Sequence, residues 1–294
     1  MKINTLINQH KSKFDKFYKK LLKHKLNNSV LSKAMMYSSI NGGKRIRAFL
    51  VSQSSKMVNL SNKNMMLIAS SIEAIHSYSL IHDDLPSMDN DDFRRGKPST
   101  HKKFNEATAI LAGDALHDLA FELLSDSLNN INPEKNLKLL NYLTMCTGYD
   151  GLAGGQSLDL LYENKKLSKL KIINMYKKKT GKLFEFSFAA PFIIVGETNS
   201  RINFSKKYGS IFGIVFQIID DLLDETNNFK KMGKTPGKDI KQGKRTLQSI
   251  VGNDNVIKYC EKIINEFIIQ YKKEFKKNPI LKDLLEFNLQ RLNN

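Results

Sequence analysis

Apolar residues recur every three or four positions along most of the chain, which is the spacing of one face of an α-helix. The step is clearest in one segment, at Leu67, Ile68, Ser71, Ile72 and Ile75. The same spacing predicts four further helices, over residues 136–147, 168–188, 205–224 and 256–275. Alternating runs bounded by hairpin turns, which would predict strands, are scarce. The sequence therefore predicts an all-α fold.

Turn-forming residues separate the predicted helices at Asn132-Pro133, Thr198-Asn199-Ser200 and Gly233 to Gly237. No Pro/Gly/Ser-rich or low-complexity stretch marks a linker, so we expect residues 1–294 to form a single domain. No repeat of solenoid period is present. We therefore expect one helical bundle around a central cavity, with a site in its core.

The formal net charge of +18 fits nucleic-acid binding, an acidic substrate, or a drift of composition toward lysine. Most lysines are dispersed and lack the interleaved aromatic residues of proteins that bind single-stranded nucleic acid. We therefore attribute most of the excess positive charge to compositional drift and expect no nucleic-acid partner. A smaller basic group lies beside glycines or aspartates and supplies the functional candidates: Lys44, Arg45, Arg47, Arg94, Arg95, Lys234 and Lys244.

The ends and the apolar stretches of the chain bear on its compartment. Met1 to Lys13 lacks a sustained apolar core, so we expect no secretory signal. The longest apolar stretches, around residues 189–195 and 211–219, are much shorter than a bilayer span. The two cysteines, Cys146 and Cys260, have no paired spacing, which fits a reducing compartment. We therefore expect a cytoplasmic protein without a membrane span.

The first of two aspartate clusters contains Asp83, Asp84 and Asp89. Pro86 cannot continue a regular helix, so the helix from about residue 65 should end near Asp84, and the turn can bring Asp89 beside Asp83. Carboxylates this close repel one another unless a cation lies between them. Oxygen ligands without His or Cys favour a hard ion, Mg²⁺ before Ca²⁺. A solvated acidic loop is the alternative interpretation.

The second cluster follows the three-and-four spacing that places side chains on one helical face: Gln217, Asp220, Asp221 and Asp224. Its neighbours over residues 211–223 are almost all apolar, so the segment cannot be a solvated face. Carboxylates in such a helix need compensation, because an unpaired buried charge is very costly. A bound cation supplies it in one interpretation, and ion pairs with basic residues elsewhere in the fold supply it in the other.

From about Tyr37 to about Val251 the sequence resembles the bacterial short-chain trans-isoprenyl diphosphate synthases, most closely the farnesyl diphosphate synthases among them. The two aspartate clusters match the paired aspartate-rich motifs of that family, the first followed by Arg94 and Arg95 and the second preceded by Phe216 and Gln217. Three more segments match: Gly42-Gly43-Lys44-Arg45-Ile46-Arg47, Gly154-Gly155-Gln156 with Asp159, and Lys179-Thr180-Gly181.

The resemblance implies the isoprenoid synthase fold and a reaction in which an allylic diphosphate ionises and isopentenyl diphosphate attacks the carbocation. It assigns catalysis to Asp83, Asp84, Asp89, Asp220, Asp221 and Asp224, with Mg²⁺ held by Asp83, Asp89 and Asp220. Arg94, Lys179 and Lys234 would bind the allylic diphosphate, and Lys44, Arg47, His76 and Arg95 that of isopentenyl. Thr180 and Gln217 would face the carbocation. The resemblance also implies a homodimer.

Tyr78 lies five positions before the first aspartate, where the family lines the tunnel that receives the growing tail. A bulky aromatic there would stop elongation, so the resemblance implies that dimethylallyl and geranyl diphosphates are converted to the fifteen-carbon farnesyl diphosphate. An ordinary core tyrosine with a paired hydroxyl is the alternative for Tyr78, as a packing residue is for the lone helical His76.

Four alternative functions remain at this level. A geranylgeranyl diphosphate synthase would share the whole pattern. A terpene cyclase would not need the second diphosphate pocket of Lys44, Arg47 and His76. From another class, the chain could be a catalytically silent subunit or a basic nucleic-acid binder, although intact aspartates in both clusters argue against silence.

Overall fold

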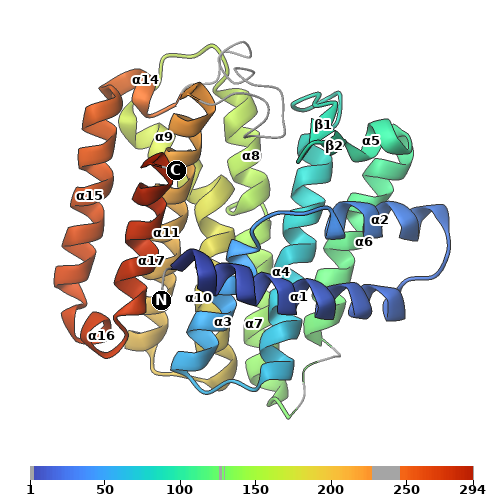
Figure 1. The fold of residues 1–294 in the computed structure, drawn as a ribbon, viewed down its shortest axis with the longest axis horizontal. Coiled ribbons are helices and arrows are strands. Elements are labelled where there is room, and N and C mark those ends of the chain that lie inside the picture. Colours follow the sequence, from blue (N-terminus) through green and yellow to red (C-terminus); the bar gives the residue numbers. More distant parts are fainter. Residues whose placement is uncertain (1–2, 126–127, 129, 227–245, 294) are drawn as a thin grey trace. The chain divides into compact units, whose positions relative to one another are not determined.

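The computed structural model describes residues 3–125, 128, 130–226 and 246–293 (Figure 1). Helices account for nearly all of this part of the chain, and its only strands are β1 (Phe93–Arg94) and β2 (Lys97–Pro98), each two residues long. The predicted all-α fold is confirmed. The described residues up to 144, together with 187–198, form one compact unit, and residues 145–186, 199–226 and 246–293 form a second. A single domain over 1–294 stays a prediction.

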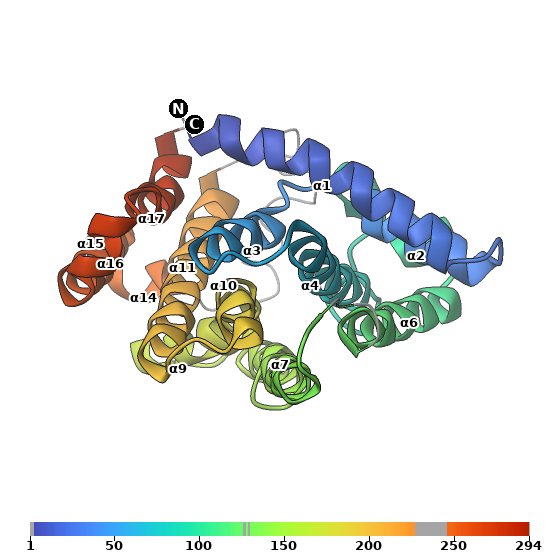
Figure 2. The same ribbon diagram turned by 90° about the horizontal axis from the view of Figure 1, so that it is seen from below.

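The first unit contains the helices of the N-terminal half of the chain: α1 (Ile3–Lys25), α2 (Val30–Ile40), α3 (Ile46–Met57), α4 (Asn62–Asp83), α5 (Thr100–Lys103) and α6 (Glu106–Ser125). In this unit α4 packs between α3 and α6 (Figure 2). Its apolar stripe faces these neighbours, because Ile68, Ile72 and Ile75 are fully buried. The periodicity that predicted the helix therefore also marked its packing face.

Helix α4 begins and ends where its sequence requires. The Ser61 side chain accepts a hydrogen bond from the Asn64 amide at 3.3 Å, which caps the first turn. The helix ends at Asp83, two residues before Leu85-Pro86, as the proline predicted. After the turn, β1 and β2 form a hairpin whose central residues Arg95 and Gly96 both have positive φ, at 55° and 73°. This geometry matches the right-handed twist of the strands.

Helices α7 (Pro133–Thr147) and α10 (Lys182–Val195) each contribute residues to both units. The second unit contains the remaining elements: α8 (Leu152–Leu161), α9 (Lys169–Tyr176), the π-helical turn η1 (Lys177–Gly181), α11 (Asn199–Thr226), α14 (Gln248–Val251), α15 (Asn253–Gln270), α16 (Lys272–Lys277), α17 (Ile280–Gln290) and the 3₁₀ turn η2 (Arg291–Asn293). Helices α7 and α11 begin at the predicted breaks, at Pro133 and Asn199. The predicted break at Gly233 to Gly237 lies outside the described residues.

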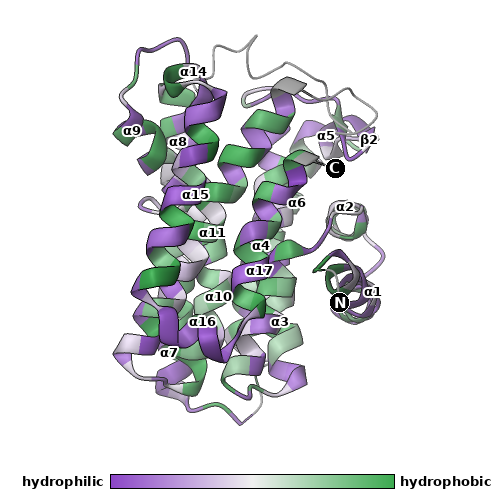
Figure 3. Ribbon diagram, turned by 60° about the vertical axis from the view of Figure 1, so that its left-hand side comes forward, coloured by the Kyte–Doolittle hydropathy of each residue, from purple (hydrophilic) through white to green (hydrophobic). Residues whose placement is uncertain are grey.

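Helix α15 is amphipathic, with hydrophobic and hydrophilic residues alternating around it (Figure 3). Its buried stripe consists of Val256, Cys260, Ile264 and Phe267, and the Phe267 ring stacks on Phe204 at a centroid distance of 5.9 Å. This buried stripe packs α15 against α11 in the same unit. Across the described part of the chain, no helix combines the length and the hydropathy that crossing a bilayer would require.

Candidate active site

The turn after α4 brings the first aspartate cluster together. The Asp89 amide donates to the Asp83 carbonyl at 2.8 Å, and the Asp91 amide donates to the Asp84 carbonyl at 3.1 Å. Asp83 and Asp89 are partly exposed, whereas Asp84 is only 2% exposed. The turn therefore places Asp89 beside Asp83, as predicted, and turns Asp84 inward.

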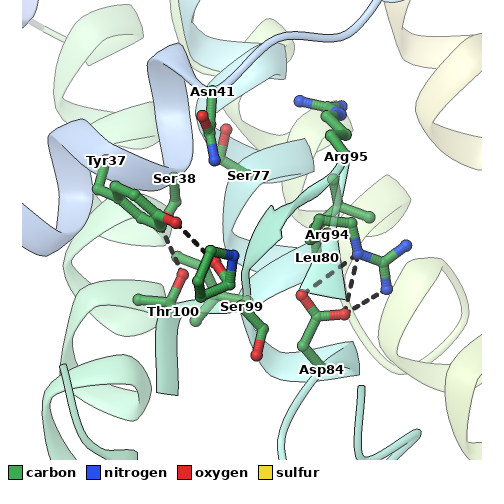
Figure 4. A pocket seen from close by; sticks show the side chains of 12 residues that line it. Tyr37, Ser38, Asn41, Ser77, Leu80, Asp84, Arg94, Arg95, Ser99 and Thr100 are labelled. Atoms are coloured by element: carbon green, nitrogen blue, oxygen red, sulfur yellow. Dashed lines mark hydrogen bonds and ion pairs between the residues drawn. The ribbon is translucent and has the colours of Figure 1, made fainter. Parts of the chain in front are cut away.

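Arg94, from the hairpin, is the partner of the buried Asp84. Its Nε lies 2.9 Å and 3.2 Å from the two carboxylate oxygens, and its Nη2 also contacts Oδ1 (Figure 4). Burial raises the pKa of Asp84 to about 6, although the guanidinium acts in the opposite direction. Charge-assisted pairs of this kind fix geometry as well as charge. Asp84 thus holds the hairpin in place, and Asp83 and Asp89 are the better placed carboxylates for a metal.

The glycine-rich loop before α3 and the second hairpin arginine form a basic site in the same unit. Gly42 and Gly43 have φ of 93° and 92°, and a Cβ at Gly43 would lie 2.8 Å from Cζ of Arg95. Arg95 Nη1 donates to the Gly42 carbonyl at 2.9 Å, and its Nη2 lies 3.4 Å from Nε2 of His76. The positive φ favours glycine at position 43, and the bare backbone also leaves room for the Arg95 guanidinium.

His76 is neutral in this basic site. Burial lowers its pKa well below the usual value, and the charges of Arg47 and Arg95 lower it further. A neutral imidazole can accept a hydrogen bond at Nε2 from Arg95 and donate one from Nδ1. Lys44 is exposed and Arg47 is half-buried at the start of α3. The structure thus brings His76 and Arg95 together beside the loop that contains Lys44 and leads into α3.

Arg45, which the sequence grouped with the functional candidates, is instead a structural residue. It is 4% exposed, and its guanidinium donates to Asp15 at 2.8 Å, to Glu73 at 3.0 Å and to the Ser39 carbonyl at 2.6 Å. Its backbone is left-handed, with φ of 55°, at the N-terminus of α3. An arginine compensated on all sides in this way fixes the loop that presents Lys44 and Arg47.

Tyr78, the expected chain-length residue, lies on α4 among aromatic side chains of the first unit. Its ring meets the imidazoles of His82 and His117 edge-on, at centroid distances of 4.9 Å and 5.3 Å. His82 is itself fixed, because its Nε2 donates to the Ile110 carbonyl at 3.0 Å and a Cβ at Gly113 would lie only 2.1 Å from that atom. The position of Tyr78 therefore depends on α6 as well as on its own helix.

The second aspartate cluster lies on one face of α11, as its spacing predicted. Asp221 and Asp224 are buried, while the Asp220 side chain is 39% exposed. Asp220 is paired with Arg291, whose guanidinium also lies 4.2 Å from the centroid of the Phe216 ring. The ion-pair interpretation of this cluster thus applies to Asp220 in the absence of a metal.

Asp221 belongs to a buried hydrogen-bond chain in the second unit. Its Oδ1 accepts from Gln217 Nε2 at 2.7 Å, and its Oδ2 accepts from the Tyr176 hydroxyl. The Gln217 carbonyl oxygen in turn accepts from the Thr180 hydroxyl at 2.6 Å. Burial and the Asp221 charge raise the pKa of Tyr176 well above the usual value, so the phenol keeps its proton. The two residues expected beside the carbocation are therefore linked to each other.

The π-helical turn presents both Lys179 and Thr180. Lys179 Nζ donates to the Asp159 carboxylate at 2.6 Å. A Cβ at Gly155 would lie 2.1 Å from the Lys179 backbone nitrogen, so the glycine allows α8 to pack closely on the turn. π-helical turns occur often at functional sites.

Two further observations concern ligands. Lys234, expected on a diphosphate, lies outside the described residues. Among the residues that the structure does describe, no three His, Cys, Asp or Glu side chains form a ready metal site. Mg²⁺ fits this arrangement nonetheless, because it takes only one or two carboxylates and completes its octahedron with water and phosphate oxygens.

Sequence reasoning missed Tyr176, Arg291 and the partners of Arg45. Tyr176 lies four residues before Thr180 and reads as an ordinary core aromatic. Arg291 lies 71 positions from Asp220, and Glu73 lies 28 from Arg45, so no local spacing links them. The only available signal was the demand for a donor by each carboxylate that lies in an apolar segment.

Comparison with known proteins agrees with this geometry. A family model described as polyprenyl synthetase matches residues 28–286. The chain is 41% identical over 227 residues to the farnesyl diphosphate synthase of Haemophilus influenzae, which covers 76% of this chain and 77% of that protein. It is 37% identical over 239 residues to a chloroplastic geranylgeranyl pyrophosphate synthase of Catharanthus roseus, covering 80% of this chain and 66% of the plant protein.

Among solved structures, a geranyltransferase of Helicobacter pylori complexed with magnesium and isoprenyl diphosphate matches with a TM-score of 0.84 at 30% identity. That match covers 99% of this chain and 98% of the other. The family model spans most of the chain, and the relatives cover most of it at well over 30% identity. The chain therefore belongs to the polyprenyl synthetase family.

Proposed function

We propose that this protein is a Mg²⁺-dependent prenyltransferase that condenses isopentenyl diphosphate with dimethylallyl and then geranyl diphosphate to give farnesyl diphosphate. One observation carries the proposal most strongly. The turn after α4 holds Asp89 against the backbone of Asp83, while the neighbouring Arg95, neutral His76 and the glycine loop form a basic site in the same unit. Carboxylates for a metal and cations for a diphosphate are the two requirements of this chemistry.

The residues of the first unit would bind and orient diphosphate. Lys44, Arg47 and Arg95 would bind isopentenyl diphosphate, because a guanidinium matches phosphate oxygens in two directions and a lysine adds a compact charge. Neutral His76 would orient Arg95 and donate from Nδ1 without adding a further charge. Asp84 and Arg94 would keep the hairpin at a fixed distance from α4.

The residues of the second unit would stabilise positive charge. The oxygens of Thr180 and Gln217 form one hydrogen-bonded set with Asp221, and such fixed dipoles stabilise a developing carbocation without reorganising. Lys179, together with Lys234, would bind the allylic diphosphate. Asp83 and Asp89, and Asp220 in its own unit, would hold Mg²⁺, which when bound supplies Lewis-acid stabilisation of the leaving diphosphate.

Tyr78 supports the fifteen-carbon product, since its bulky ring is fixed by two imidazoles on its helix and on α6. A twenty-carbon product is the second candidate, because a geranylgeranyl pyrophosphate synthase is nearly as similar to this chain as a farnesyl diphosphate synthase. A homodimer is the assembly that the family resemblance implies, and sedimentation velocity would test it; a cytoplasmic location is the expectation from the apolar stretches and cysteines of the sequence.

The decisive experiment incubates the purified protein with labelled isopentenyl diphosphate, dimethylallyl diphosphate and Mg²⁺, and separates the dephosphorylated products by chromatography. Farnesol that disappears with EDTA and returns with added Mg²⁺ supports the proposal. Detection of geranylgeraniol would support the proposed reaction but assign a twenty-carbon product in place of farnesyl diphosphate. If isopentenyl diphosphate binds at equilibrium but no product forms, the proposal fails and a silent subunit is favoured.

A further inference from the structure

The Tyr176 side chain is buried in the second unit and lies at one end of the hydrogen-bond chain that reaches Thr180. The residue is 2% exposed. Its hydroxyl donates to Oδ2 of Asp221 and accepts from the backbone amide of Leu247 at 3.1 Å. Leu247 is itself fully buried and precedes α14. One hydroxyl thus joins a carboxylate of the second aspartate cluster to a distant segment of backbone.

The direction of every proton in this chain follows from its two ends. The Leu247 amide can only donate, so the Tyr176 oxygen accepts there and its own proton points to Asp221. An ionised carboxylate can only accept, so Gln217 must present its NH₂ group to Asp221 and its carbonyl oxygen to Thr180. The Thr180 hydroxyl must then donate to Gln217. Neither lone pair of the Thr180 oxygen takes part in this hydrogen-bond chain.

We infer that Tyr176 is a positioning residue of the active site, whose hydroxyl orients Asp221, Gln217 and Thr180 so that their oxygens face positive charge. This inference rests on the proposed function, since it assigns to Tyr176 the orientation of dipoles needed in the transition state. Without the hydroxyl, Asp221 loses one donor and can rotate about its χ2 torsion. The Gln217 amide is then no longer held in one orientation, and the Thr180 hydroxyl can turn its proton toward the carbocation.

The effect should appear in turnover and leave isopentenyl diphosphate binding unchanged, because the hydrogen-bond chain consists of second-unit residues, none of which is assigned to that substrate. Removing hydrogen-bonded support of this kind typically costs about tenfold to a hundredfold in activity. Tyr176→Phe should therefore lower kcat by about tenfold or more, with the KM for isopentenyl diphosphate within about twofold of the wild-type value.

Tyr208→Phe is a matched control. Tyr208 lies in the same unit, is fully buried, and donates to a backbone carbonyl, that of Leu281, at 2.9 Å. Both substitutions remove one buried phenol oxygen and should cost similar stability, about 1 kcal/mol or somewhat more. Only Tyr176→Phe should depress kcat. Equal kcat losses in the two variants would overturn the inference.

Two further readouts separate positioning from general destabilisation. Amide hydrogen exchange at Leu247 in the substrate-free protein should accelerate in Tyr176→Phe and remain unchanged in Tyr208→Phe. In a double-mutant cycle, the fold-loss of kcat in the variant with both Tyr176→Phe and Gln217→Leu should be smaller than the product of the two single fold-losses. The reason is that both residues act through one hydrogen-bond chain. Losses that simply multiply would contradict the inference.

The inference and the proposed function can fail separately. A wild-type protein without prenyl transfer would refute the proposed function, and the exchange rate at Leu247 would still report whether Tyr176 holds that amide. An active wild-type protein with a fully active Tyr176→Phe variant would refute only the positioning role.

Discussion

Arg94 donates from Nε to both carboxylate oxygens of Asp84, at 2.9 Å and 3.2 Å, although ten residues and a complete turn separate the two in sequence. The next residue toward the N-terminus, Asp83, is partly exposed and accepts the Asp89 amide at its carbonyl. Neighbouring aspartates of one motif therefore have different surroundings. The carboxylate of Asp84 is buried against an arginine of its own unit, whereas the Asp83 side chain is partly exposed.

Substituting the two aspartates should separate stability from activity. Asp84→Ala removes the carboxylate that Arg94 contacts most closely and leaves it with Asp91, at 3.8 Å, so it should lower the free energy of unfolding by about 2 to 3 kcal/mol. Asp83→Ala should change it by less than about 1 kcal/mol, yet reduce turnover by about a hundredfold or more. Urea denaturation and product assays on both variants provide the measurements. Equal destabilisation by the two substitutions would contradict the assigned surroundings.

His10 on α1 should make the protein sensitive to mild acid. Burial lowers its pKa to about 4, from an ordinary value of about 6.5 in the unfolded chain. The unfolded state therefore binds a proton that the folded state refuses, and the contribution of His10 to stability falls as the pH decreases from about 6.5 to about 4, while the raised pKa of Asp84 acts in the opposite direction. Below that window the loss should reach about 3 kcal/mol, because each pKa unit corresponds to about 1.4 kcal/mol.

Denaturation of His10→Phe across this pH range would test the assignment. The phenyl ring can keep the packing against Phe14 and Phe49 but cannot bind a proton, so stability should depend less on pH. His24→Gln, which alters an exposed imidazole on the same helix, is the control and should retain the wild-type dependence. Identical pH profiles for wild type and His10→Phe would rule out His10 as the source.

Product length should respond to a residue that does not belong to any recognised motif. A Cβ at Gly113 would lie 2.1 Å from Nε2 of His82, so Gly113→Ala must displace the imidazole that meets Tyr78 edge-on. We expect a larger fraction of twenty-carbon product, in the same direction as Tyr78→Ala but smaller. Chromatography of the dephosphorylated products measures it. Ala107→Ser, at an exposed position of α6, should leave the distribution unchanged.

Arg291 should compete with divalent cations for Asp220. The two are paired, and Arg291 is held over the Phe216 ring, so a metal at Asp220 must displace a positive charge. Arg291→Ala should therefore raise the affinity for Mn²⁺ in the absence of substrate, measured by electron paramagnetic resonance titration. Lys282→Ala removes a charge from an exposed pair in the same unit and should have a smaller effect. An affinity that is unchanged or lower in Arg291→Ala would contradict the competition.

Local spacing was enough to predict both aspartate clusters and the segments that contain α4, α7, α9 to α11, α15 and α16, but not the remaining helices. Pro86 predicted the end of α4, and the three-and-four spacing of residues 217–224 predicted one face of α11. The helix predicted over residues 168–188 has a π-helical turn at Lys177–Gly181, and that over 256–275 stops at Gln270 and begins again at Lys272. Neither interruption changes the spacing of the apolar residues enough to be detected. Strands of two residues are too short to show the alternation of polar and apolar residues that predicts a strand.

Pairs between residues that are distant along the chain could not be predicted from the sequence. Arg94 was expected on a diphosphate, but its partner in the structure is Asp84, and Arg45 was grouped with the functional cations although it is buried against Glu73. An arginine whose guanidinium lies beside a glycine loop and an arginine that is buried in the fold can have the same neighbours in the sequence. Only the three-dimensional path of α1, α3 and α4 decides which arginine faces solvent.

The π-helical turn at Lys177–Gly181 has a consequence for the helix that follows it. An α-helix advances about 100° around its axis with each residue, so one additional residue in a turn rotates everything after it by about that angle. Helix α10 therefore begins out of phase with α9, although the chain continues without a break. Deleting a single residue here would restore an unbroken helix and turn the buried Leu183, Phe184 and Phe186 away from their packing. The length of this segment is consequently under tighter constraint than the identity of its exposed side chains.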